Sequence, residues 1–96
     1  MNYFLGIDIA KTNHVASLIN NTGDVVIRAI KFTNSIEGFN KLLSTIQDKL
    51  GDLSNIEVAM EATGHYWLSL YSTLTDNGFN VSVYNPYQIK SYRGAY

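Results

Sequence analysis

The sequence predicts an α/β fold built on one mixed five-stranded sheet. Two observations carry this prediction. Strand-like alternation of apolar and polar residues fills the first third of the chain, and segments with helical spacing then separate two further strands. Short turns join the first three strands, which therefore run antiparallel, whereas each later strand follows a helix and runs parallel to its neighbour.

The first third of the chain predicts an antiparallel meander. From Tyr3 onward every second side chain is apolar and faces one way, while Gly6 and Asp8 face the other. Lys11 begins a short turn, and the residues around Gly23 tolerate the positive φ of a second turn. The three strands are expected at residues 3–10, 14–19 and 25–32.

The period then changes to that of a helix. Asn34 is the expected N-cap, Glu37 stands three residues on in capping-box style, and Gly51 suits the position after the last turn. The apolar positions of this helix are Ile36, Phe39, Leu42, Leu43, Ile46 and Leu50.

The rest of the chain predicts a strand, a helix, a strand and the start of a third helix. The fourth strand is expected at residues 56–61, with apolar side chains on one face. Thr63 is the expected N-cap of a second helix that ends at Gly78, and residues 79–84 form the fifth strand. Pro86 suits the first position of a third helix.

The connections between these elements fix the order of the strands. Each helix returns the chain for a parallel strand, normally by a right-handed crossover, and the fourth strand lies most simply beside the first. The predicted spatial order is therefore 3-2-1-4-5, with helices after strands 3, 4 and 5, which is the RNase H-like (RuvC-like) arrangement. A plain doubly wound βαβ sheet fits the opening meander poorly.

Length and composition fit one folded domain over residues 1–96. Apolar residues make up 46% of the chain and charged residues 16%, which argues against a disordered tail. The net charge of −1 excludes a broadly basic nucleic-acid-binding arm, and the lack of cysteine excludes disulfides and thiolate metal sites. No apolar run approaches a membrane span and no signal peptide precedes the first strand, so a cytoplasmic protein without membrane contact is expected.

Two acidic residues on the predicted strands form the candidate site. Asp8 interrupts an apolar strand between Gly6 and Ala10, small neighbours on its face that leave room for a ligand. Glu61 ends the fourth strand with Ala59 beside it on the same face. Adjacent strands would bring both carboxylates together as ligands of Mg²⁺ or Mn²⁺, which promote phosphodiester cleavage. The plainer alternatives are that Asp8 caps a turn and that Glu61 pairs with a surface lysine.

The Gly-x-Asp pattern around Asp8 is weak evidence when taken alone, because it also opens the phosphate loop of actin-like ATPases. That family usually has a further glycine nearby, where this chain has Ala10 and Lys11. It also needs two large lobes, and 96 residues are too few for them.

Three blocks of the sequence resemble motifs of the DEDD transposases of the insertion-sequence one-ten family. The blocks are residues 6–11, residues 60–67, and residues 83–86 followed by Gln88 and Lys90. They occur in the family's order and at compatible spacing over nearly the whole chain. The resemblance implies a RuvC-like, metal-dependent domain whose first Asp and first Glu correspond to Asp8 and Glu61.

The same resemblance implies what the chain acts on and what it lacks. The family's substrate is DNA, and its partners are a structured guide RNA and further copies of the protein. Two more aspartates, in a Lys-x-Asp-x-x-Asp-Ala block after the Asn-Pro segment, are missing here, as is the domain with the nucleophilic serine. The chain is therefore expected to be a truncated form that binds Mg²⁺ or Mn²⁺ weakly and is inactive alone.

Several other side chains are candidates for contact with nucleic acid. Lys11, Lys90 and Arg93 are expected to meet phosphates, although an exposed turn lysine is an equal alternative for Lys11. His65 is expected to be neutral, because a cation is disfavoured at a helix amino terminus. A group of tyrosines either contacts nucleic acid or packs on a neighbour: Tyr84, Tyr87, Tyr92 and Tyr96.

Two other functions stay open. One is a non-catalytic nucleic-acid-binding or assembly module with the same fold, which the missing carboxylates favour. The other is a Holliday-junction resolvase of the RuvC type, against which residues 61–65 argue. A homo-oligomer is expected in any case, because the apolar strand at residues 25–32 forms a sheet edge with few charges to discourage pairing.

Overall fold

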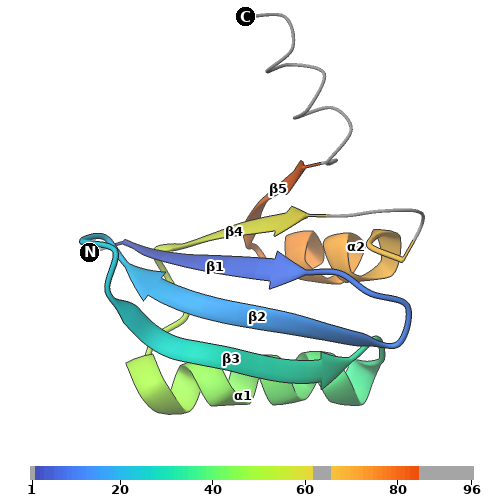
Figure 1. Ribbon diagram of the computed structural model, residues 1–96, viewed down its shortest axis with the longest axis horizontal. Coiled ribbons are helices and arrows are strands. Elements are labelled where there is room, and N and C mark those ends of the chain that lie inside the picture. Colours follow the sequence, from blue (N-terminus) through green and yellow to red (C-terminus); the bar gives the residue numbers. More distant parts are fainter. Residues whose placement is uncertain (1, 62–65, 85–96) are drawn as a thin grey trace, which may run out of the picture.

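The computed structural model describes residues 2–61 and 66–84, in which five strands form one sheet and two helices pack against it (Figure 1). The strands are β1 (Tyr3–Asp8), β2 (Asn13–Asn20), β3 (Val25–Thr33), β4 (Ile56–Glu61) and β5 (Asn80–Tyr84). The helices are α1 (Ile36–Leu50) and α2 (Leu68–Asp76). The third helix, expected from Pro86, lies outside the described residues.

The strands follow the order β3-β2-β1-β4-β5, which confirms the predicted topology. β1 pairs antiparallel with β2, and β2 with β3, whereas β4 runs parallel to both β1 and β5. The strand at residues 25–32 is a sheet edge, as expected. Because β1, β4 and β5 are parallel, their carboxyl ends meet at one end of the sheet.

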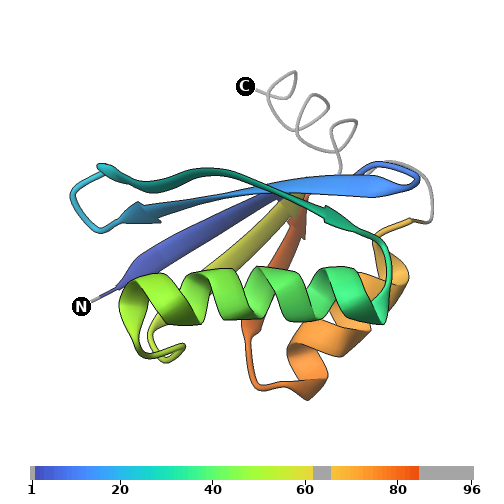
Figure 2. The same ribbon diagram turned by 90° about the horizontal axis from the view of Figure 1, so that it is seen from below.

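Both helices cover the same face of the sheet, and no helix from residues 2–61 and 66–84 covers the other face (Figure 2). Alternate residues of the strands point toward the helices and form the core with them. The largest fully buried side chains are Leu5, Leu18, Leu42, Ile46, Met60, Leu74 and His14. The sheet therefore has a covered face and an open face, defined by the presence or absence of α1 and α2.

Helix α1 begins one residue after the expected cap. Ser35, and not Asn34, is the N-cap, because its backbone is extended and its Oγ accepts the Gly38 N–H at 3.0 Å. Asn34 stays tied to the sheet, since its N–H donates to the Thr12 carbonyl at 3.0 Å. The predicted capping box is therefore wrong: Glu37 stands two residues after the N-cap and not three.

The buried stripe of α1 starts one turn later than predicted. Phe39 is 8% exposed, and Leu42 and Ile46 are fully buried, but Ile36 is 75% exposed. Ile36 occupies the first helical position, where its side chain lines an open groove beside α2 and does not reach the sheet. Two further predicted members of the stripe are partly buried: Leu43 and Leu50.

The second helix is shorter than predicted at its start. It begins at Leu68, with Trp67 at the N-cap position and no side-chain cap hydrogen bond. Thr63, the expected cap, lies outside the described residues. In the first turn of α2 the Tyr71 N–H donates to the Trp67 carbonyl at 2.9 Å, and the Leu70 side chain is buried. Both predicted glycine ends are confirmed, with Gly51 at φ 75° and Gly78 at φ 88°. Within the described ranges, neither helix has the length and apolar character that a membrane span requires.

Candidate functional site

Asp8 and Glu61 lie side by side at the ends of two neighbouring parallel strands. They are register partners and the last pair of the β1–β4 ladder, and just beyond them the Ile9 N–H donates to the Glu61 carbonyl at 3.4 Å. Both side chains are exposed and line one cavity on the open face. The predicted placement of these acids at adjacent strand ends, on one face, is therefore confirmed.

Small residues form the floor beside the two acids. Gly6 and Ala59 are register partners two positions before Asp8 and Glu61, and Ser17 lies opposite Gly6 on β2. A Cβ added to Gly6 would meet no atom within 4 Å. These residues line an open cavity of about 650 Å³. The open face therefore leaves room above the carboxylates.

The carboxylates of the pair have no hydrogen-bond or ion-pair partner among the residues that the structure describes. Other acids of the chain do have such partners. Asp52 accepts from the Ser54 hydroxyl at 2.6 Å, which is the main reason that the pKa of Asp52 is lowered. In residues 2–61 and 66–84, neither the turn-cap alternative for Asp8 nor the lysine-pair alternative for Glu61 is found.

Tyr84 belongs to this cavity, although the sequence placed it with the tyrosines of the tail. It ends β5, is the register partner of Glu61 and is 47% exposed. Its side chain lines the cavity with both acids. The predicted strand order already paired the fifth strand with the fourth, so alternation along residues 79–84 was the signal that could have identified it.

His14 is a second residue that the sequence interpretation missed. It is fully buried on the covered face, and its Nδ1 accepts the Ala10 N–H at 3.2 Å. This side-chain acceptor replaces a strand partner, which explains why β1 ends at Asp8 and not at Ala10 as predicted. The signal was present, because His14 alternates in phase with the buried residues Ala16 and Leu18 of β2.

The remaining predicted site residues are placed only in part. Lys11 is exposed in the turn after β1, three residues beyond Asp8. The other candidates lie outside the described residues: His65, Lys90, Arg93, Tyr87, Tyr92 and Tyr96. Within residues 2–61 and 66–84, no group of three or more His, Cys, Asp or Glu side chains gathers as a metal site. Asp8 and Glu61 are therefore a pair of acidic side chains that no third acidic side chain, His or Cys from the described part of the chain joins.

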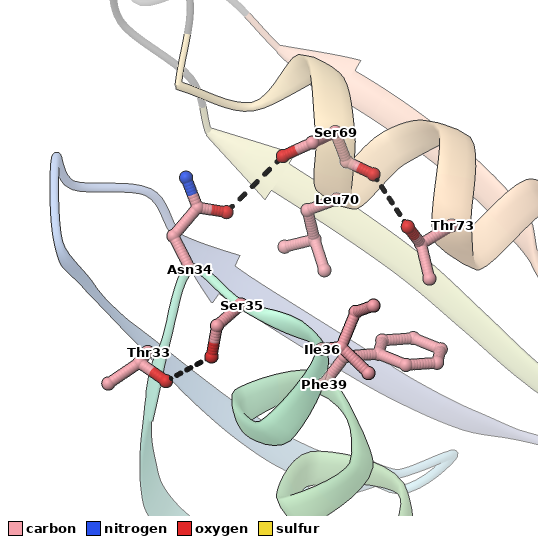
Figure 3. A pocket seen from close by; sticks show the side chains of 8 residues that line it. All are labelled: Thr33, Asn34, Ser35, Ile36, Phe39, Ser69, Leu70 and Thr73. Atoms are coloured by element: carbon pink, nitrogen blue, oxygen red, sulfur yellow. Dashed lines mark hydrogen bonds between the residues drawn. The ribbon is translucent and has the colours of Figure 1, made fainter.

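A second cavity, of about 200 Å³, lies between the first turns of α1 and α2 on the covered side (Figure 3). Its polar groups bond to one another: Ser69 Oγ donates to Asn34 Oδ1 at 3.3 Å, and Thr73 Oγ1 donates to the Ser69 carbonyl at 2.8 Å. No acidic or basic side chain lines it. The bond between Ser69 and Asn34 connects α2 to the β3–α1 connection. The cavity therefore has a structural explanation, and it lacks the charged groups that a metal or phosphate site needs.

Comparison with known proteins places these features in a family. A model of the DEDD domain of IS110 elements, described as a transposase, matches residues 5–96. The chain is 34% identical over 89 residues to a pilin gene-inverting protein of Moraxella lacunata and 36% identical over 90 residues to the one of Moraxella bovis. Each match covers 93% of this chain, which spans 27% of the length of either relative.

A solved structure with the same architecture is that of RuvC from T. thermophilus in complex with a Holliday junction substrate. The TM-score is 0.60 at 15% identity, and the match covers 95% of this chain and 69% of that one. At this identity the likeness speaks for the fold alone. The strand order and the two helices are those of a RuvC-like, RNase H-like fold.

Proposed function

The chain belongs to the DEDD transposases of the IS110 family, and from this membership we propose that residues 1–96 are the amino-terminal part of a RuvC-like site that cleaves and rejoins DNA strands with divalent metal. One observation carries the proposal: Asp8 and Glu61 stand together at adjacent strand ends. Their carboxylates face open space and have no partner in the described part of the chain. Acids placed in this way serve no evident packing purpose and suit a ligand.

The pair of donors fits a hard divalent cation. Carboxylate oxygens are preferred by Mg²⁺ and Mn²⁺, and Asp8 and Glu61 would hold such an ion on the open face. A bound ion would supply Lewis-acid chemistry for phosphodiester cleavage, through activation of a water or hydroxyl and stabilisation of charge. Affinity depends on the number and charge of the ligands. With two acids, the 96-residue chain is expected to bind the ion weakly and to cut DNA negligibly.

Other residues of the open face suit a nucleic-acid backbone. Gly6 and Ala59 keep the space above the sheet free, so that a substrate can approach the acids. Lys11, exposed three residues beyond Asp8, offers a cation to a phosphate. Lys90 and Arg93, which lie outside the described residues, are proposed for the same kind of contact.

A Mn²⁺ titration of the 96-residue chain, followed by NMR, tests the proposed ligands. Paramagnetic broadening is expected first at the amides next to Asp8 and Glu61. Asp8→Asn or Glu61→Gln should remove it, because each replaces a charged ligand by a neutral amide. Glu57→Gln is the matched control, since Glu57 lies on the same face of β4 and already accepts from Asn80 Nδ2 at 2.7 Å.

The outcomes of this titration separate cleanly. Broadening that persists in Asp8→Asn and Glu61→Gln, or that disappears in Glu57→Gln, would contradict the assignment of the acid pair. A parallel assay with supercoiled plasmid and Mg²⁺ tests the expected inactivity of the chain alone. Robust nicking there would mean that the named residues are an incomplete account of the site.

A non-catalytic nucleic-acid-binding or assembly module is the second candidate function. The observation in its favour is that no third acidic side chain joins Asp8 and Glu61 within residues 2–61 and 66–84. This candidate predicts DNA binding that is unchanged by Mn²⁺ and by Asp8→Asn. A resolvase of the RuvC type is less well supported, because the likeness to RuvC concerns the fold and the block at residues 61–65 resembles the transposases.

The proposed partners are DNA, a structured guide RNA and further copies of the protein. The first two rest on the family resemblance. Self-association has support in the molecule, because β3 is a sheet edge and its first residue, Val25, is 54% exposed. Light scattering over a concentration series tests it: a species of 10.7 kDa that persists at high concentration would contradict a homo-oligomer.

A further inference from the structure

His14 stands out in the core because it is polar. Every other fully or nearly buried side chain that the structure describes there is a hydrocarbon or a thioether. Its ring packs edge-on against Phe32, with centroids 5.3 Å apart and an interplanar angle of 66°. A leucine or phenylalanine would suit this position on β2 by packing alone. The presence of a histidine therefore has to be explained by a polar interaction of its ring.

The bonding of the ring identifies that reason. Nδ1 accepts the Ala10 N–H, which makes the ring neutral with its proton on Nε2. Nε2 is buried without a hydrogen-bond partner among the described residues. Burying such a donor is unfavourable. The imidazole therefore carries a cost that an apolar residue would avoid, and its polar contribution among the described residues is the bond from the Ala10 N–H.

That bond lies immediately behind the acid pair. Asp8 is the last residue of β1, and a strand end frays unless the chain beyond it is held. Two backbone donors hold it here: the Ile9 N–H bonds to the Glu61 carbonyl on β4, and the Ala10 N–H bonds to His14 on β2. The first of these is long, at 3.4 Å, so the second matters more.

We propose that His14 is a positioning residue, which fixes the carboxyl end of β1 from the covered face and thereby holds the Asp8 carboxylate beside Glu61. The inference rests on the proposed function of the acid pair. His14 does not line the cavity on the open face and acts there through the backbone of residues 8–10. It is thus distinct from a ligand or a catalytic group.

Two substitutions of similar polarity test the bond. In His14→Asn the side-chain oxygen is two bonds from Cβ, as Nδ1 is, so it can still accept the Ala10 N–H. In His14→Gln the amide reaches further, toward the Nε2 position, and leaves the Ala10 N–H without its acceptor. Both variants put an amide into the core, so a general loss of stability affects both and is not the readout.

The first readout is hydrogen exchange of the Ala10 amide in the 96-residue chain, measured relative to core amides such as that of Leu18. We expect exchange to accelerate about tenfold in His14→Gln, which is the effect of losing one hydrogen bond, and to stay within about threefold of the parent in His14→Asn. Equal exchange in the two variants, or unchanged exchange in His14→Gln, would overturn the proposed role.

The second readout is the Mn²⁺ dissociation constant from paramagnetic broadening. It is expected to rise several-fold in His14→Gln and to recover in His14→Asn, because the Asp8 end is again held. If the parent itself shows no site-specific Mn²⁺ binding, the proposed function fails, and Ala10 exchange still decides whether His14 holds the end of β1. If Mn²⁺ binds the parent and both variants equally, the positioning role is refuted while the acid pair stands.

Discussion

The two faces of the sheet come from the same strands and differ in what occupies them. On the covered face, alternate positions of β1 and β4 hold buried apolar side chains: Leu5, Ile7, Val58 and Met60. The positions between them are small or acidic: Gly6, Asp8, Ala59 and Glu61. Packing against α1 and α2 accounts for the first set, whereas nothing in the described part of the chain packs on the second.

This difference separates residues that hold the fold from residues available for chemistry. Asp and Gly are depleted in strands, because they pack poorly on a pleated surface. Natural sequences break local rules of this kind chiefly at functional sites. Asp8 breaks this rule on the open face. On the covered face directly behind, His14 breaks another, because it is a polar side chain buried among apolar ones. Both irregularities lie at the same end of the sheet.

Gly38→Ala on the covered side should give the largest loss of stability. A Cβ on Gly38 would lie 1.9 Å from the Thr33 carbonyl oxygen, and relief requires moving α1 away from β3. We expect the free energy of unfolding in urea to fall by about 3 kcal/mol or more, at the upper end for overpacking. The control is Gly6→Ala on the open face, where the added Cβ meets no atom within 4 Å. This variant should raise the free energy of unfolding by about 0.5–1 kcal/mol, because alanine is favoured over glycine inside a strand. Equal losses would abolish the distinction between the faces.

The next effect in size concerns the two sides of α1. Leu42→Ala removes a fully buried side chain and is expected to lower the free energy of unfolding by about 2–4 kcal/mol through lost burial and a cavity. Ile36→Ala should cost less than about 0.5 kcal/mol, because Ile36 is 75% exposed. Both variants are measured by urea denaturation. A comparable loss in the two would show that Ile36 contributes to the core as Leu42 does, contrary to its exposure in the structure.

Strand order and the acid pair could be predicted because they depend on local signals. Alternation assigned Asp8 and Glu61 to the face away from the core, and turn lengths and crossover handedness made their strands neighbours. The start of α1 could not be predicted in the same way. Asn34 and Ser35 are both good caps, and the choice depends on the Asn34 N–H, which bonds to Thr12 across the sheet.

The part of the site that escaped prediction depends on contacts between distant segments. Alternation within β5 could have given the face that Tyr84 occupies, but its place beside Glu61 depends on the register between β5 and β4. His14 begins the second predicted strand, and its role depends on the backbone of Ala10, which alternation within that strand does not reveal. Sequence periodicity thus fixes which face a residue occupies, and the partner that it meets there depends on register.

Neutralising the acids on the open face should raise stability slightly. Asp8 and Glu61 are directly opposed, and like charges in such a pair are destabilising. Asp8→Asn is therefore expected to increase the free energy of unfolding by about 0.5 kcal/mol at low salt, and added salt should shrink the gain by screening. Asp24→Asn is the contrasting control, because Asp24 accepts from Thr22 Oγ1 at 3.1 Å and should lose stability. A loss in Asp8→Asn would indicate that this acid is structural.

The smallest expected effect belongs to Asp52, an acid in the connection between α1 and β4. The Ser54 side chain and then the Ser54 N–H donate to its carboxylate, and these bonds lower the pKa of Asp52 from its ordinary value of 3.8. A carboxyl whose pKa is lower in the folded than in the unfolded chain adds stability above the unfolded value. That contribution disappears as the pH falls through the folded value.

Asp52→Asn should accordingly lower the thermal midpoint slightly at neutral pH, and the difference from the parent should close as the pH is taken below 3.8. The effect is small because Asp52 is fully exposed and water competes for its hydrogen bonds. Ser54→Ala removes the main donor and should give the same pH dependence. A difference in thermal midpoint that stays constant from neutral to acidic pH would show that the charge of the Asp52 carboxylate does not stabilise the fold. The contrast with Asp8 and Glu61 would then consist only in the hydrogen bonds that Asp52 accepts.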